Sequence, residues 1–127
     1  MNLIEQIAHH LAFCGFGTVA TAESDGNIHW GRMPDAPDDC ICVYSHDSAV
    51  PGAPQGARIQ IMNRAISPRT AYETSVNIAK ALDDFQGFLA GDGDMVTIDV
   101  VNSAAGLGGD TKKRELYSTN IRVFYCE

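Results

Sequence analysis

Residues 58–85 read RIQIMNRAISPRTAYETSVNIAKALDDF, and this stretch decides the fold class. Polar and apolar residues alternate over 58–64, which predicts a strand with one buried and one solvated face. Ser67 suits a helix N-cap and Pro68 suits the first helical position,. Small and apolar residues then recur on one stripe at helical spacing, which predicts a helix over residues 68–85. The stripe consists of Ala71, Ser75, Ile78, Ala79 and Leu82.

The N-terminal segment predicts a second helix, over residues 2–14. Asn2 and Glu5 have the spacing of a capping box, and Gly15 ends the helical pattern,. One apolar face is formed by Leu3, Ile4, Ile7, Ala8, Leu11 and Ala12,. His9 and His10 fall on the polar side, so we expect both imidazoles to be solvated.

Short apolar runs between the helices predict further strands. Residues 18–22 and 28–30 flank an Asp-Gly pair, which indicates a β-hairpin,. Prolines and aspartates over 34–39 predict an acidic loop, because proline removes backbone donors and crowded carboxylates repel one another,. Residues 40–44 have almost no polar side chain and predict a strand buried on both faces,. Residues 47–57 contain prolines and glycines without periodicity and predict a long exposed loop,.

The C-terminal part completes the expected sheet. Residues 95–101 are rich in β-branched side chains and predict a strand, followed by a glycine-bearing loop over 102–114 and a last strand over 116–125,. Strands grouped between two helices favour an α+β fold, a mixed and mainly antiparallel sheet of about four to six strands with both helices on one face. A chain of 127 residues without repeat or boundary predicts a single domain, 1–127,.

Composition excludes several classes of protein. Hydrophobic residues make up 45% of the chain and charged residues 20%, which excludes a disordered tail, a collagenous repeat and a coiled coil,. The net charge of −7 disfavours binding to phosphates, so we expect no sequence-specific nucleic-acid binding,. No apolar run reaches the roughly 20 residues of a membrane span and no secretory leader is visible, so we expect no membrane contact. We expect reduced cysteines for the same reason.

The common motifs of catalysis and of metal or cofactor binding do not occur. Cys40 and Cys42 are too close in sequence for a zinc-ligand pair,. Residues 91–94 lack the glutamate that closes a calcium loop, and residues 106–110 lack the Gly-Lys-Ser/Thr of a phosphate loop,. Ser45, His46 and Asp47 are adjacent in sequence, so their side chains point in different directions on an extended chain and do not form a catalytic triad,. We therefore expect no metal, no cofactor and no enzymatic activity.

Acidic and basic residues are separated along the chain. Acids dominate residues 1–57, whereas most lysines and arginines follow. Because head-to-tail contact between an acidic and a basic patch can close a ring, we expect basic residues of one subunit to approach acids of its neighbour. The candidate interface residues are Arg58, Arg64, Lys112, Lys113 and Arg114 on the basic side and Asp35, Asp38 and Asp39 on the acidic side. A merely solvated surface explains the charge pattern equally well.

Three stretches, taken in order, carry a family resemblance: residues 3–15; residues 58–61 with 67–72 and 81–82; and residues 107–120. The last stretch is similar to a closing loop and strand of the pattern P-x-x-x-G-x-D-x-x-G-R-x-x-x-x-x-N. Together they resemble the minor capsid and tail-terminator (tail-completion) proteins of long-tailed bacteriophages. Lys113 stands where that pattern often has glycine, and Ala105 stands where it often has proline.

This resemblance implies a structural virion protein of a phage or prophage, without enzymatic activity or cofactor. It implies a homo-hexameric ring that caps the tail tube, ends its polymerisation and offers a surface for head-tail joining. The implied partners are the tail tube protein and a head-completion (connector) protein. The implied location is the head-proximal end of the tail, after synthesis in the host bacterial cytoplasm. The alternative is a small bacterial α+β enzyme or ligand-binding domain that uses loops 47–57 and 102–114 around a pocket.

Overall fold

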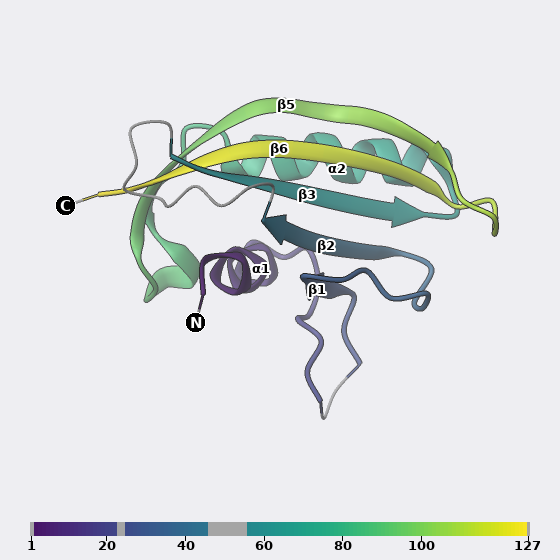
Figure 1. Cartoon of the computed structure of the whole chain (residues 1–127), viewed down its shortest axis with the longest axis horizontal. Helices are drawn as coiled ribbons and strands as arrows, with labels where there is room; N and C mark the ends of the chain where they lie inside the picture. Colours follow the sequence, from purple (N-terminus) through teal and green to yellow (C-terminus); the bar gives the residue numbers. More distant parts are fainter. Residues whose placement is uncertain (1, 23–24, 46–55, 127) are drawn as a thin grey trace.

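The computed structural model describes residues 2–22, 25–45 and 56–126 (Figure 1). Within these described residues, two α-helices, one short 3₁₀ helix and six strands follow one another. They are α1 (Leu3–Phe13), β1 (Ile28–Trp30), β2 (Cys40–Ser45), β3 (Ala57–Ala65), α2 (Pro68–Leu82), β4 (Gln86–Phe88), η1 (Leu89–Gly91), β5 (Met95–Gly109) and β6 (Glu115–Tyr125).

All six strands form one mixed sheet in the order β1-β2-β3-β6-β5-β4. Only the β1–β2 pair is parallel, and the other four pairs are antiparallel. The long strands β3, β5 and β6 curve together, and β5 and β6 end in a hairpin at the side opposite the C-terminus (Figure 1). The α+β class expected from the sequence is therefore confirmed.

Both helices pack on the same face of this sheet. Along β3 the side chains of Ile59 and Ile61 are buried in the core, whereas Arg58, the residue before Ile59, is exposed on the opposite face, as the alternation predicts,. The core joins residues of both helices to the inward residues of β2, β3, β5 and β6. Its largest members include Ile7, Leu11, Ile28, Val43, Ile61, Ile78, Leu82, Ile98, Ile121 and Val123. We call the other face of the sheet, which none of the helices in the described ranges covers, the outer face.

The helix caps lie where the sequence places them. Asn2 Oδ1 accepts a hydrogen bond from the Glu5 N–H at 2.8 Å, and Ser67 Oγ accepts one from the Thr70 N–H at 3.3 Å. The second helix ends at Leu82 rather than at residue 85, because Asp84 adopts a left-handed φ of 57° that turns the chain into β4,. Strand β4, which the sequence pattern does not predict, follows this turn directly.

The hairpin expected over residues 18–30 is wrong. Val19 makes an isolated parallel bridge to Ile28, so the two segments run in the same direction. The side chain of Asn27 forms a hydrogen bond with the backbone of the first segment, since its Oδ1 accepts from the Thr18 N–H at 2.9 Å. Gly26 then lies directly on that segment, where a Cβ would stand 2.3 Å from the Thr18 carbonyl oxygen. The glycine of the Asp-Gly pair therefore serves a close backbone approach and not a tight turn.

The glycine-bearing loop expected over 102–114 is also wrong for most of its length. Strand β5 continues to Gly109, and only residues 110–114 form the turn to β6. Three register shifts between β5 and β6 absorb the irregular stretch, between Val100 and Asn102, Asn102 and Ala105, and Gly106 and Gly108,. The long loop expected over 47–57 falls largely on residues 46–55, which lie outside the described residues.

His10 is buried, against the expectation of a solvated imidazole pair. Its side chain fills the junction between α1 and η1, where Nδ1 accepts a hydrogen bond from the Ala90 N–H at 2.8 Å. The ring of Phe85 lies 4.5 Å from the imidazole, centroid to centroid. Burial lowers the pKa of His10 below its ordinary value,. The neutral imidazole is thus the form that the fold requires, because a protonated Nδ1 cannot accept this bond.

We expect the free energy of unfolding to fall as the pH is lowered from 7.5 to 5. The folded pKa of His10 lies below the unfolded value, so the unfolded chain binds more protons in this range,. The stabilisation is fully present above the unfolded pKa of about 6.5 and is lost as the pH falls through the folded pKa. Urea titrations at several pH values measure the slope. In His10→Asn, which keeps an acceptor without a titrating group, that slope should become shallower; an unchanged slope would contradict the assignment.

Candidate assembly surface

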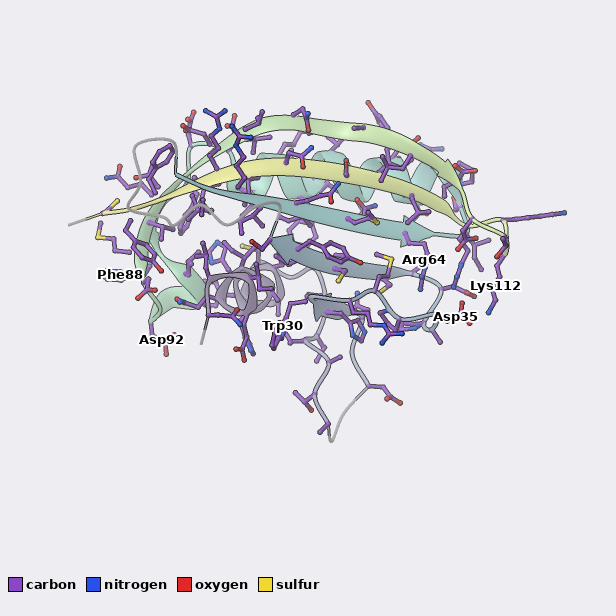
Figure 2. All side chains as sticks on the ribbon, in the orientation of Figure 1. Trp30, Asp35, Arg64, Phe88, Asp92 and Lys112 are labelled. Carbon is purple, nitrogen blue, oxygen red and sulfur yellow. The ribbon has the colours of Figure 1, made fainter. Side chains whose placement is uncertain are left out.

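Charged side chains from three distant segments meet at the end of the sheet where β3 stops and β6 begins. Figure 2 labels Asp35, Arg64 and Lys112 at this end of the sheet. The acidic loop predicted over 34–39 is longer in the structure, where residues 31–39 form it; it lies here on the outer face and covers the start of β2. We call the group formed by Arg64, Arg114, Lys112, Asp35, Asp38 and Asp110 the arginine cluster.

Arg64 ties the backbone of the acidic loop to β3. Its residue is only 6% exposed although it points to the outer face, because the loop covers it. The guanidinium donates to the carbonyl oxygens of Asp38 at 3.0 Å, Pro37 at 2.7 Å and Asp35 at 3.3 Å. An arginine fork that meets three carbonyls fixes the loop's path rather than one contact point.

Arg114 connects the same loop to the β5–β6 hairpin. Its side chain is 5% exposed, and its guanidinium pairs with the carboxylates of Asp110 at 2.8 Å, Asp35 at 3.1 Å and Asp38 at 3.3 Å. It also donates to the Asp35 carbonyl oxygen. Lys112 adds an exposed ion pair to Asp35. The loop and the hairpin are therefore held in one arrangement by charge-assisted hydrogen bonds.

The two best-connected carboxylates titrate below their usual range. The hydrogen bond from Lys112, and next the one from Arg114, lower the pKa of Asp35. The backbone N–H of Arg114 and then its guanidinium lower the pKa of Asp110, against an opposing effect of burial. Both groups thus favour the folded state at neutral pH, and that contribution is lost as the pH falls below the unfolded pKa of about 3.9.

The structure places the remaining predicted site residues differently. Asp39 is exposed, and its Oδ1 accepts from the Ile66 N–H at 3.3 Å. Lys113 is exposed at the hairpin tip with a left-handed φ of 61°. Arg58 lies on the outer face at the other end of β3, away from the arginine cluster.

The expected attraction between basic and acidic residues exists within one chain. Arg64, Lys112 and Arg114 contact the acidic loop of their own subunit, so these contacts stabilise the subunit itself. Charge sorting along a sequence cannot distinguish the two cases, because folding also brings opposite charges together. A role of the same residues at a subunit interface stays a prediction.

Asp110 belongs to this cluster but is not among the residues that charge sorting singles out. Its Oδ1 accepts the backbone N–H groups of Lys112 and Arg114, both at 2.9 Å, and so shapes the turn. An aspartate followed two and four residues later by lysine and arginine in a glycine-rich segment is a signal that could have found it.

Large apolar side chains are exposed at both ends of the sheet. At the β4 end, Phe88 is 55% exposed, and its strand neighbour Met95 is exposed as well. At the hairpin end, Ile66 is 58% exposed and Leu107 is 49% exposed. Phe13 and Tyr125 are also exposed at the β4 end, and Tyr72 is also exposed at the hairpin end.

We define two patches by these residues. The β4-end patch consists of Phe13, Phe88, Met95 and Tyr125, and the hairpin-end patch of Ile66, Tyr72 and Leu107. Figure 2 labels Phe88 at one end of the sheet and Lys112 of the hairpin at the opposite end. Exposed apolar groups that gather at one end of a protein commonly mark contact sites between proteins.

The described part of the chain offers no metal site. Among residues 2–22, 25–45 and 56–126, no group of three or more His, Cys, Asp and Glu side chains could hold a metal ion. Cys40 and Cys42 are buried thiols, and burial raises the pKa of Cys40 to about 11. The alternative function places a pocket between loops 47–57 and 102–114. The second of these loops does not exist as predicted, because residues 102–109 belong to β5.

None of the helices in the described part is long and apolar enough to cross a membrane. No curated protein matches the chain. The family model of the bacteriophage tail terminator protein matches residues 15–125, which include every strand of the sheet, the acidic loop and the β5–β6 hairpin. The chain therefore belongs to the bacteriophage tail terminator family and is a structural protein of the phage tail.

Proposed function

We propose that this protein assembles as a homo-hexameric ring on the head-proximal end of the tail tube, ends the polymerisation of the tube and presents a surface for head-tail joining. The family match over residues 15–125 is the observation that carries this proposal. The partners are further copies of this chain, the tail tube protein and a head-completion protein. The role is structural, as a minor component of the virion, and needs no cofactor.

The two apolar patches support ring closure. A ring is built from a heterologous interface, in which one surface of a subunit contacts a different surface of the next. The β4-end patch and the hairpin-end patch lie at opposite ends of one sheet and differ in composition. Each subunit can thus bury its Phe88 side against the Leu107 side of a neighbour, and rotation about a common axis closes the ring.

The predicted charged residues fit the rim of this interface. All of them except Arg58 lie at the hairpin end, next to Ile66 and Leu107. Exposed charges at a rim mainly change the rate of association and its salt dependence, not the stability of the contact. We propose this steering role for Lys113 and Asp39, because neither side chain takes part in the ion pairs of the described residues.

Two half-blocked subunits test the ring. We expect Phe88→Glu to block the β4-end patch and Leu107→Glu to block the hairpin-end patch, because a charge at the centre of an apolar contact is left unpaired. Each variant alone should stay a folded monomer in native mass spectrometry. Mixed together, the two should form a dimer through their remaining intact surfaces, and nothing larger.

Asn77→Glu is the matched control, since it adds the same acid on the exposed side of α2. It should assemble like the unmodified chain. Rings formed by Phe88→Glu or Leu107→Glu alone would reject the two-patch interface. A mixture that remains monomeric would show that the two patches do not contact each other.

A further inference from the structure

Strand β5 is paired with another strand along only one of its sides for most of its length. On the side away from β6, β4 pairs with residues 95–97, and none of the described strands lies beside the rest of β5. The N–H of Ala104 donates to Ser75 Oγ at 3.1 Å, so α2 engages this side as far as Ala104. Residues 105–109 have no such partner in the described part of the chain, and none of them is buried. We call them the free edge of β5.

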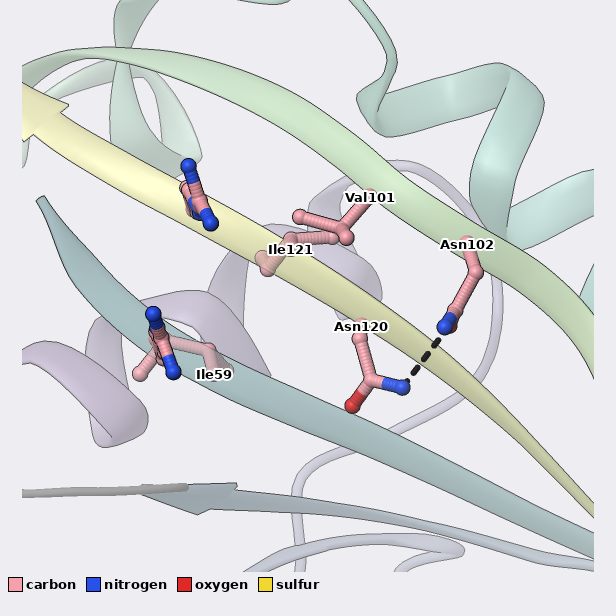
Figure 3. A pocket seen from close by; sticks show the side chains of 7 residues that line it. Ile59, Val101, Asn102, Asn120 and Ile121 are labelled. Atoms are coloured by element: carbon pink, nitrogen blue, oxygen red, sulfur yellow. Dashed lines mark hydrogen bonds between the residues drawn. The ribbon is translucent and has the colours of Figure 1, made fainter. Parts of the chain in front are cut away.

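The backbone that leads to this free edge is fixed within the subunit. Ser75 Oγ, which holds Ala104, also lies 3.2 Å from Thr119 Oγ1 on β6. On the β6 side the ladder continues to the end of β5, and Asn120 Nδ2 donates to Asn102 Oδ1 at 2.7 Å across the two strands (Figure 3). A strand that is already held in place loses less conformational freedom when a partner binds it.

The free edge carries none of the usual protection against pairing with another chain. Proteins commonly protect an exposed strand edge with charged side chains or proline. Residues 105–109 read Ala-Gly-Leu-Gly-Gly and contain neither. The three glycines leave the backbone uncovered, and Leu107 is 49% exposed. An unprotected edge of this kind is suited to accept a strand from a partner through main-chain hydrogen bonds.

Strand β4 offers a second free edge on the same sheet. The carbonyl oxygen of Phe85 accepts from the Ile98 N–H at 2.9 Å, and the N–H of Leu89 donates at 3.0 Å to the carbonyl just before β5. In an antiparallel pair, the backbone groups of alternate residues point to opposite sides. Those of Gln86 and Phe88 therefore point away from β5. None of the described strands pairs with β4 on that side.

We propose that the free edge of β5 pairs with β4 of the neighbouring copy, so that main-chain hydrogen bonds join the sheets of successive subunits. The inference rests on the proposed ring and specifies how its two contact surfaces are connected. The backbone groups of Gln86 and Phe88 supply donors and acceptors for the uncovered backbone of residues 105–109. The same pairing brings Phe88 of one subunit close to Leu107 of the next, both of which are exposed in the single chain.

Charge complementarity favours β4 of another copy as the occupant. Asp84 and Asp92 flank β4, are exposed and take part in none of the ion pairs of the described residues. Lys113 is exposed at the hairpin tip, just beyond the free edge of β5. Figure 2 labels Asp92 beside Phe88, at the end of the sheet opposite the hairpin. In either strand direction, one of the two acids lies on the side of the lysine, whereas pairing β4 with β4 would bring acids together.

A proline at position 86 tests the main-chain contact. Gln86→Pro removes the N–H that points away from β5 and leaves the groups that face β5 in place, as proline does on edge strands. It should raise the subunit concentration needed for half-maximal ring assembly by at least about tenfold. Gln86→Ala, which loses the side chain and keeps the N–H, is the matched control and should assemble like the unmodified chain. Native mass spectrometry over a range of concentrations measures both, and circular dichroism checks that each variant is folded.

Amide hydrogen exchange on the unmodified chain gives a second test that needs no folded proline variant. In the ring, the amides of Gln86 and Phe88 should exchange at least about tenfold more slowly than in the Leu107→Glu monomer. Residues 105–109 should show the same slowing relative to the Phe88→Glu monomer.

The outcomes separate the pairing from the ring. Equal assembly of Gln86→Pro and Gln86→Ala, or unchanged exchange of these amides in the ring, would overturn the main-chain contact while the ring stands. If the unmodified chain forms no ring, the proposed function fails and the pairing fails with it.

Discussion

Replacing Leu82 by alanine is expected to lower the free energy of unfolding by about 2–5 kcal/mol, the range found when a buried leucine site is emptied. Leu82 is fully buried and is the last apolar residue of the α2 stripe before the chain turns at Asp84. It packs in the core that α2 shares with α1 and the sheet. Alanine has the higher helix propensity, so the loss reports packing and not helix formation.

Urea titration of Leu82→Ala at pH 7.5 measures this loss. Lys80→Ala, two residues earlier on the exposed side of the same helix, is the control and should change the free energy of unfolding by less than about 0.5 kcal/mol,. A similarly small change for Leu82→Ala would place the stripe at the surface and contradict the packing of α2 on the sheet.

Replacing Arg64 by methionine is expected to cost about 3 kcal/mol, because three hydrogen bonds from a charged donor are lost and part of that loss is offset by water. Methionine keeps the apolar stem of the side chain and removes the guanidinium. The carbonyls of Asp35, Pro37 and Asp38 then lose their common donor. The acidic loop should become more accessible while the core remains folded.

Two measurements check the Arg64→Met result. The urea midpoint gives the loss of stability, and amide hydrogen exchange over residues 31–39 shows where the loss occurs. Arg64→Lys should lie between the two forms, since a lysine ammonium cannot reach three carbonyls as a fork. Arg69→Met, at an exposed ion pair on α2, should change neither readout. Normal protection of the loop in Arg64→Met would contradict its role as the loop's anchor.

The elements that periodicity predicts correctly are those in which local sequence and burial agree. Residues 58–64 alternate because one face of β3 packs on the core, and α2 begins at Pro68 because Ser67 caps it. The hairpin over 18–30 fails because a side chain of Asn27 replaces strand pairing, which no pattern reveals. The loop over 102–114 fails because glycines usually interrupt strands, whereas register shifts accommodate them here,.

The candidate site divides in the same way. Charge sorting selects Arg64, Arg114 and Asp35 as interface residues, and the fold brings these three together within one chain. It does not say whether the partners belong to one chain or two, because that depends on distances the sequence does not contain. Asp110 is missed, because charge sorting does not show that its carboxylate accepts the backbone N–H groups of Lys112 and Arg114.

The register shifts of the β5–β6 hairpin separate two parts of one element. Over residues 95–100 the side chains alternate between the core and the outer face, so packing constrains which substitutions are tolerated there. From Val101 to Gly109 no residue of β5 is buried, and the three register shifts to β6 fall within this stretch or at its start. We call residues 101–109 of β5 the outer arm. Because the bulges can absorb an inserted or deleted residue, a change in the length of this arm leaves the strand register over 95–100 unchanged. An insertion or deletion in the outer arm is therefore expected to change how far the arm extends while the rest of the sheet keeps its fold.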